Sequence, residues 1–331
     1  MLTGIILLGG MYMNGKWSPV LLAVALVVGF PRLVFGIWTL SQRSDTVPKE
    51  TTIQQVFTET KIHLLTDKGI EEIEIEEYLI GVLLREIPGR FHIEAQKAQA
   101  IVARTYALRT TQYKDKHSSN AICTDPGCCQ GYRNPNEYLQ GGGDEERVNL
   151  ARQAVDETKG QILIYQGMPI DATYFSCSGG QTEDALAVWG VDVPYLQSVS
   201  SPGEELADHY WDSIQFTPDE FKTALGADLS GKPDQWFGSV TYTRGGGVES
   251  MLIGGQLYTG TELRSLLGLR STAFSVAVSN NSISITTRGF GHRVGMSQYG
   301  AQAMALQGKE YEEILAHYYP GTEIDKDRFI G

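Results

Sequence analysis

A glutamate at the end of an apolar helical pattern, Glu86, is the first candidate for chemistry in this sequence. Leu79, Val82 and Leu83 precede it by seven, four and three residues, a spacing that places the carboxylate on the apolar face of a helix. The proline in residues 87–89 ends the pattern, so this carboxylate also lies at the helix C-terminus, where the macrodipole disfavours an anion. Both effects raise the pKa of a carboxyl group and favour proton donation near neutral pH. A glutamate paired with a nearby arginine is the structural alternative.

Potential metal ligands are concentrated in one short segment. A histidine and three cysteines lie within thirteen residues, at His117, Cys123, Cys128 and Cys129. These ligand types can close a tetrahedral zinc site, and a set of four leaves no open position, which indicates a structural or site-organising metal. Two alternatives remain open. Cys123 could form a disulfide with one of the adjacent cysteines, or the thiols could be unliganded.

Cys177 and His292 offer a different chemistry. A thiol and an imidazole in contact would indicate a cysteine peptidase or amidase. The imidazole lies in the glycine-dense segment 289–300, which precedes a predicted helix and suits the close approach of a substrate. The spacing of these glycines does not match a dinucleotide-binding fingerprint.

Two cations lie on a partly apolar helix face. Lys97, Ile101, Arg104 and Leu108 share one face of a predicted helix at 93–113. Tyr106 lies on a neighbouring face of the same helix. Cations in this position indicate an internal ion-pair network, a binding wall for a polar substrate, or both.

The elements that must position these residues mix helices with antiparallel strands, which predicts an α+β fold. A hairpin turns at Asp67-Lys68-Gly69, and a second one turns at residues 280–281. Residues 114–145 are predicted to form a loop, and 186–250 show no assignable pattern. The predicted elements, in chain order, are a hairpin within 56–75, helices at 76–86, 93–113 and 146–158, two strands within 161–175 joined at Gly167, a short helix at 261–266, a hairpin at 274–287 and a helix at 296–306.

The N-terminal segment differs from the rest of the chain. Residues 20–30 are uninterruptedly apolar, and an extension through Trp38 approaches the roughly 20 residues that a membrane-spanning helix needs. We therefore predict a membrane anchor at 1–43, a juxtamembrane linker at 44–55 and a single catalytic domain at 56–331. A cleaved signal peptide is the alternative, although no small-residue cleavage site follows the apolar stretch. The flanking charges do not decide the orientation.

Composition limits the class of partner. The chain has 331 residues and a net charge of −12, with a sequence pI of about 5.0. A protein this acidic has no basic stripe with which to neutralise phosphates, which argues against nucleic acid as a partner.

Four blocks of sequence resemble the stage II sporulation protein D (SpoIID) family. The first is EEYLIGVLLREIPGRFHIEAQKAQAIVARTYAL at 76–108, in which Ile87 replaces the methionine usual in the family. The others are YFSCSGGQTED at 174–184, VWGVDVPYLQSVSSP at 188–202 and GFGHRVGMSQYGAQAMA at 289–305. Their order and spread make the resemblance cover nearly all of residues 50–320.

The resemblance implies a peptidoglycan lytic transglycosylase that cleaves between N-acetylmuramic acid (MurNAc) and N-acetylglucosamine (GlcNAc), with Glu86 as acid and base. Glycoside hydrolases use two carboxylates. A lytic transglycosylase can use one, because the muramoyl 6-hydroxyl attacks its own anomeric carbon. Glu94 and Asp184 are the nearest candidates for a second carboxylate. SpoIID-like amidase enhancers (LytB-like) provide the alternative, a non-catalytic adaptor of cell-wall remodelling.

The resemblance also implies ligands, partners and location. Some family members bind zinc through histidine and cysteine in the loop matched by His117 to Cys129. The expected substrate is denuded glycan strands, with the amidase/endopeptidase SpoIIP and the membrane protein SpoIIM as partners during engulfment in sporulation. The expected location is a single-pass protein of the cell membrane, with its catalytic domain extracytoplasmic on the mother-cell side of the septum. The candidate substrate-binding residues are Lys97, Arg104, Tyr106, Ser178, His292, Ser297, Gln298 and Tyr299.

Overall fold

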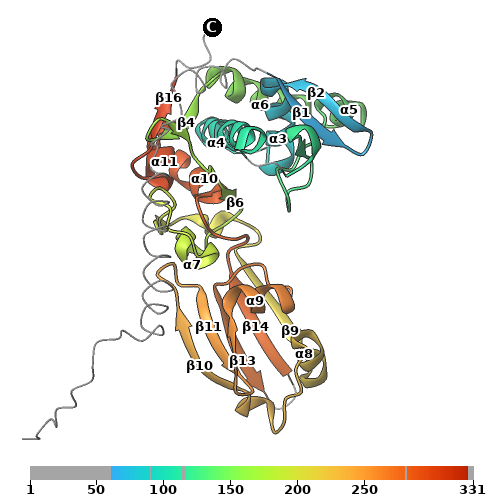
Figure 1. Cartoon of the computed structure of the whole chain (residues 1–331), viewed down its shortest axis with the longest axis vertical. Coiled ribbons are helices and arrows are strands. Elements are labelled where there is room, and N and C mark those ends of the chain that lie inside the picture. Colours follow the sequence, from blue (N-terminus) through green and yellow to red (C-terminus); the bar gives the residue numbers. More distant parts are fainter. Residues whose placement is uncertain (1–60, 90, 114–115, 280–281, 327–331) are drawn as a thin grey trace, which may run out of the picture. The chain divides into compact units, whose positions relative to one another are not determined.

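An antiparallel hairpin leads directly into the helix that carries Glu86. The computed structural model describes residues 61–89, 91–113, 116–279 and 282–326 (Figure 1). Strands β1 (Lys61–Thr66) and β2 (Gly69–Glu74) pair around the predicted turn. Helix α3 (Ile75–Glu86) follows without a break and ends where Ile87 adopts an extended conformation before the proline. The hairpin and the helix boundary predicted from sequence are therefore confirmed.

A long central helix, α4 (Ile93–Tyr113), organises the helical part of the fold (Figure 1). It has the predicted bounds and contacts α3, α6 (Glu145–Glu157), α10 (Gln298–Leu306) and α11 (Tyr311–Tyr318). Alanines along α4 are fully or almost fully buried, so the neighbouring helices can approach its backbone closely. The first and last parts of the described chain are thus held around one helix.

Short strands connect distant parts of the sequence. Strand β6 (Tyr174–Phe175) pairs in parallel with β15 (Met296–Ser297), and β3 (Ile122–Cys123) pairs in parallel with β1. The predicted strands within 161–175 separate into β4 (Ile162–Tyr165) and β5 (Met168–Pro169), which form a hairpin, and β6, which leaves it. The β6–β15 pair brings Tyr174 close to the start of α10. Other short elements near these strands in the sequence are β7 (Gly180–Gln181), α7 (Ala185–Trp189) and β8 (Ser200–Ser201), and β16 (Glu323–Asp325) pairs with β4.

Two three-stranded antiparallel sheets enclose a hydrophobic core that is distinct from the helices around α4, and we call it the second core. It is built around Phe221, Trp236, Ile253 and Ile285. Two short helices pack on this core, α8 (Pro218–Leu225) through Phe221 and α9 (Gly260–Leu266) through Leu263. The helix predicted at 261–266 and the hairpin predicted at 274–287 are confirmed, although the tip of that hairpin lies outside the described residues. The elements are β9 (Trp211–Phe216), α8 (Pro218–Leu225), β10 (Phe237–Tyr242), β11 (Val248–Ile253), β12 (Gln256–Thr259), α9 (Gly260–Leu266), β13 (Phe274–Ser279) and β14 (Ser282–Arg288).

The structure bears out the α+β class and corrects part of the sequence prediction. Residues 114–145 are not all loop, since they include β3 and helix α5 (Pro135–Gln140), which Asn134 caps through its side chain. The helix predicted at 296–306 begins at Gln298, because the two preceding residues form β15. Within the described ranges, no helix combines the length and apolar character needed to span a membrane. The anchor predicted at 1–43 and the linker at 44–55 lie outside those ranges.

Candidate active site

Glu86 lies half-buried at the end of α3, as its helical spacing predicts. The backbone N–H of Gly131 donates a hydrogen bond to its Oε1 at 2.5 Å. Burial raises the pKa of Glu86, while this N–H, the Tyr174 hydroxyl, Arg85 and Gln298 favour the charged form and limit the rise. The direction of the pKa shift predicted from sequence is therefore confirmed. The carboxyl group keeps its proton to higher pH than an exposed glutamate does.

A chain of hydrogen-bonded side chains reaches this carboxyl group through Tyr174. The Tyr78 hydroxyl donates to Gln130 Oε1 at 3.1 Å, and Gln130 Nε2 donates to the Tyr174 hydroxyl at 3.1 Å. Burial raises the pKa of Tyr174 well above its usual range, so its hydroxyl stays protonated. A protonated hydroxyl can donate to Glu86 when that group is ionised.

Two clefts meet at Glu86. The larger has a volume of about 760 Å³ and the smaller about 260 Å³, and both are lined by Glu86, Ser176 and Gln298. Among the described residues that line them, Glu86 is the only acid. Glu94 instead forms an ion pair with Lys97, and Asp184 caps α7. Neither candidate for a second carboxylate therefore reaches the clefts.

The structure brings about half of the predicted binding residues to the clefts. Tyr106 and His292 line the larger cleft, Tyr299 lines the smaller, and Gln298 lines both. Ser297 caps α10 by accepting from the N–H of Gly300, and its hydroxyl lies 3.4 Å from the Ser176 carbonyl oxygen. It therefore fixes the start of α10 that carries Gln298.

The other three predicted binding residues lie apart from the clefts. Arg104 is fully buried and donates two hydrogen bonds to Glu76, at 2.6 and 3.1 Å. Lys97 forms ion pairs with Glu94 and Glu157, and the Ser178 hydroxyl donates to the buried Glu204. Lys97 and Arg104 therefore form separate ion pairs within the protein, and neither side chain lines the two clefts.

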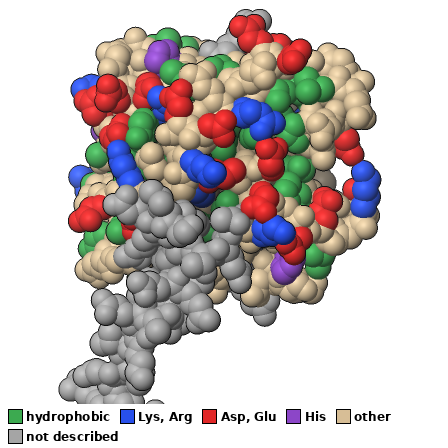
Figure 2. All heavy atoms as spheres, turned by 90° about the horizontal axis from the view of Figure 1, so that it is seen from above, with side chains coloured by type: hydrophobic (Ala, Val, Ile, Leu, Met, Phe, Trp, Pro, Cys, Tyr) green, Lys and Arg blue, Asp and Glu red, His purple; other side chains and the backbone are tan. Residues whose placement is uncertain are grey.

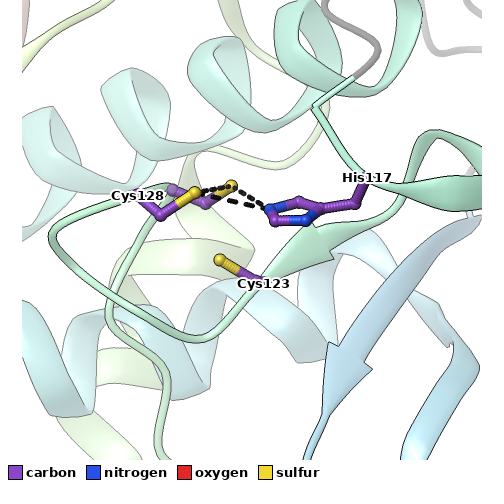
Figure 3. Close-up of side chains that lie close together, drawn as sticks. His117, Cys123 and Cys128 are labelled. Carbon is purple, nitrogen blue, oxygen red and sulfur yellow. Dashed lines mark hydrogen bonds between the residues drawn. The ribbon is translucent and has the colours of Figure 1, made fainter.

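The histidine and three cysteines converge on one point (Figure 3). Their ligand atoms all lie within 4.8 Å of one another. His117 Nε2 lies 3.4 Å from Cys128 Sγ and 3.6 Å from Cys129 Sγ, and the two sulfurs are 3.9 Å apart. A zinc tetrahedron with Zn–S of about 2.3 Å and Zn–N of about 2.0 Å has edges of roughly 3.5 to 3.8 Å. These three distances lie close to such edges, so the four side chains could hold a metal ion. The four cysteines of the chain are all free thiols, so no disulfide joins Cys123 to its neighbours.

The cysteine cluster adjoins the candidate acid. Cys128 and Cys129 line the larger cleft together with Glu86. Two residues after this cysteine pair, Gly131 supplies the N–H bound to the carboxylate. The cluster thus lies in the loop just before the point at which the loop contacts Glu86.

Comparison with known proteins places this chain in a family. A family model described as stage II sporulation protein (SpoIID) matches residues 66–165, which include Glu86 and the whole cysteine cluster. The stage II sporulation protein D of Bacillus amyloliquefaciens is 37% identical over 292 residues, which cover 86% of this chain and 84% of the relative. The chain belongs to the SpoIID family. The stage II sporulation protein D of Bacillus subtilis (strain 168) is 38% identical over 275 residues, covering 81% of this chain and 80% of the relative.

A more distant relative has a different name. The amidase enhancer of Bacillus subtilis (strain 168) is 29% identical over 304 residues, which cover 74% of this chain but 40% of that protein. This SpoIID family chain therefore resembles the two sporulation proteins over most of their length and the amidase enhancer over a part of it.

The thiol–imidazole alternative does not fit this SpoIID family chain. Cys177 is fully buried, and its Sγ donates to Glu204 at 3.3 Å. Burial, followed by the charge of Glu204, raises the pKa of the thiol far above its usual range. A nucleophilic cysteine needs the opposite shift. His292 instead accepts a hydrogen bond from the N–H of Val294 and contacts the ring of Trp189.

Sequence reasoning missed several residues of the site. Ser176 and His209 line the smaller cleft, where the serine hydroxyl lies 2.7 Å from the imidazole Nε2. Tyr174 and Arg264 line the larger cleft. Tyr174 is the first residue of one of the blocks that resemble the family, so the sequence could have identified it as a site residue. Arg264 lies outside all four blocks, and only the fold brings it to the cleft.

The contact between Gly131 and Glu86 yields a prediction. A Cβ atom on Gly131 would lie 2.7 Å from Oε1 of Glu86, so Gly131→Ala should displace the flexible carboxylate. We expect the catalytic rate of the activity proposed below to fall roughly 10- to 100-fold, because a shift of about 1 Å in a reacting group has this effect. Product formation by purified protein measures the change. An unchanged rate would show that the position of the carboxylate does not depend on this contact.

Proposed function

We propose that this chain is a peptidoglycan lytic transglycosylase that cleaves the bond between MurNAc and GlcNAc and leaves a 1,6-anhydro-MurNAc end. One observation carries the proposal. Glu86, whose pKa is raised by burial, is the only acid among the described residues that line the two clefts. A single acid that alternates between its two protonation states is sufficient for this reaction, whereas a hydrolase commonly uses two.

The protonated carboxyl group of Glu86 acts first. It donates its proton to the glycosidic oxygen, the C1–O bond of MurNAc breaks, and GlcNAc leaves with a free 4-hydroxyl group. The resulting carboxylate then accepts the proton of the MurNAc 6-hydroxyl while that oxygen bonds to C1. The Gly131 N–H and the Tyr174 hydroxyl stabilise the carboxylate between these steps. No water is consumed, and the enzyme returns to its starting form.

The cysteine cluster supports this mechanism through geometry. His117, Cys123, Cys128 and Cys129 would hold a zinc ion as a closed set of four ligands. A zinc ion bound in this way would supply structural rigidity, since no coordination position is left for substrate. The loop that it would stabilise presents the Gly131 N–H to Glu86.

We extend the proposal to the cellular role that the names of the relatives suggest. Two relatives similar over most of the chain are called stage II sporulation protein D, which supports a role in wall remodelling during endospore formation. Denuded glycan strands are the proposed substrate, with SpoIIP and SpoIIM as partners. The proposed location is the cell membrane, with residues 1–43 as the anchor and the catalytic domain extracytoplasmic.

The pKa of Glu86 predicts the pH dependence. The reaction starts from the protonated group, so kcat/KM should be constant below the raised pKa and should fall about tenfold per pH unit above it. Because the pKa is raised, this fall should begin at a higher pH than an exposed glutamate would give. Initial rates across the acidic and neutral range measure the profile. A rate that increases through this range would show that the ionised form starts the reaction.

The direct test is product analysis. Purified protein should convert denuded glycan strands into fragments that end in 1,6-anhydro-MurNAc, identified by mass spectrometry through the loss of one water relative to a hydrolytic end. Reducing MurNAc ends would indicate a hydrolase instead.

A second candidate function is an adaptor that enhances a wall amidase, and the relative named amidase enhancer favours it. An adaptor would give no cleavage of glycan strands by itself. It would instead increase the rate at which an added amidase releases stem peptides. The same incubation, with and without amidase, therefore separates the two functions.

A further inference from the structure

The larger cleft contains a cation that has no anionic partner. Arg264 lies in the last turn of α9 and lines the cleft that also contains Glu86. Among the described residues, no carboxylate lies within ion-pair distance of its guanidinium, and burial alone lowers its pKa. A half-buried guanidinium has lost part of its hydration without gaining an ion pair.

The partners of other cations make Arg264 unusual. The buried Arg104 and Arg293 pair with Glu76 and Glu183. On the surface, acidic and basic side chains are interspersed on the face shown in Figure 2, and ion pairs such as Lys309–Glu313 are frequent. In this acidic chain, a half-buried cation that neither an acid nor a backbone carbonyl of the described residues binds indicates a position that a ligand neutralises.

The smaller cleft offers no equivalent group. Arg147 uses its guanidinium to donate to the carbonyl oxygens of Leu84 and Ile87. Arg85 also lines that cleft, but its side chain is exposed and lies beside Glu86, which its charge influences. An exposed cation keeps its hydration and binds an added anion weakly.

The rest of the larger cleft indicates the kind of ligand that brings the anion. Phe175, Phe290 and Tyr106 supply aromatic surface, and His292, whose pKa burial lowers to about 4, is neutral near pH 7. Arg264 is thus the only side chain among the described lining residues that carries a positive charge near that pH. The cleft therefore suits a chain of neutral sugar rings that carries an isolated negative group.

We propose that Arg264 binds the lactyl carboxylate of a MurNAc residue from which the stem peptide has been removed, and so determines specificity for denuded strands. The inference rests on the proposed function. Hydroxyl and N-acetyl groups of the strand are neutral, and the lactyl carboxyl is an uncharged amide while a peptide is attached. After peptide removal it is a carboxylate, which a guanidinium can bind through two parallel hydrogen bonds.

The test uses two strands that differ only in this charge. One is the denuded strand, and the other is the same strand with each lactyl carboxyl converted to its methylamide. The full-length Glu86→Gln protein, which is expected to bind without cleaving, should bind the carboxylate strand roughly 10- to 100-fold more tightly than the amide strand. Adding Arg264→Gln should reduce this ratio to about one, and Arg264→Lys should restore part of it.

A matched control removes the same charge elsewhere. Arg244 is exposed and lines neither cleft, so Arg244→Gln in the Glu86→Gln protein should leave the ratio unchanged. Equal binding of the two strands by the Glu86→Gln protein would overturn the assignment, as would a ratio that persists in Arg264→Gln. Because binding is measured, this result is independent of whether the unaltered protein forms 1,6-anhydro ends, which tests the proposed function itself.

Discussion

Glu86→Gln should reduce the formation of 1,6-anhydro ends at least about 1000-fold. General acid–base catalysis by one group contributes roughly 10²- to 10⁴-fold, and here the same carboxyl group would act in both proton transfers. The amide side chain cannot supply the proton, yet its oxygen can still accept the hydrogen bond from the Gly131 N–H. Mass spectrometry of strands incubated with each protein measures the loss.

The control for this change lies on the same helix. Glu77 is exposed on α3 and pairs with Arg152 across the surface, so Glu77→Gln should retain full activity, since exposed ion pairs contribute under about 1 kcal/mol. The thermal midpoint of Glu86→Gln should not fall, because burial already disfavours the charged form of this residue. Undiminished product from Glu86→Gln would disprove its catalytic role.

Cys128→Ser should abolish stoichiometric zinc binding. The unaltered protein, purified without chelator, should contain about one zinc ion per chain, held by the four ligands of the cluster. A metal that binds only the folded chain, at a thousandfold excess over its Kd, stabilises it by about 4 kcal/mol. Loss of the metal should therefore lower the thermal midpoint by on the order of 10 °C. Metal analysis and thermal unfolding measure the two effects.

The fourth cysteine provides the matched control. Cys177 lies outside the cluster and donates to Glu204, a hydrogen bond that a serine hydroxyl can also make. Cys177→Ser should therefore keep both the zinc content and most of the stability. Unaltered protein with zinc near zero, and with thiol titration that indicates a Cys123 disulfide, would contradict the zinc site.

Local patterns in the sequence were sufficient for the part of the fold that holds the acid. The 3.6-residue periodicity of α3 and α4 and the hairpin before them depend on neighbours in the chain, so their bounds could be predicted. The cysteine cluster could be predicted for the same reason, since its ligands are close in sequence. The position of Glu86 on an apolar helix end then indicated the direction of its pKa shift.

Contacts between distant segments could not be predicted in this way. The elements within 186–250 share a core with β13 and β14, and short strands of this kind have no periodicity of their own. Helical spacing placed Arg104 and Lys97 on one face, but whether they faced substrate or acids depended on Glu76 and Glu157. Arg264 reaches the cleft only because α9 packs against the second core.

The meeting of the two clefts at Glu86 has a consequence for the products. Their lining residues differ except at Glu86, Ser176 and Gln298, so hollow surface extends from the acid to two separate regions. For the proposed reaction, sugar rings can occupy positions on both sides of the broken bond, and the strand needs no free end. Early products should then be long fragments of mixed length, the signature of endolytic cutting, and disaccharides should accumulate only late.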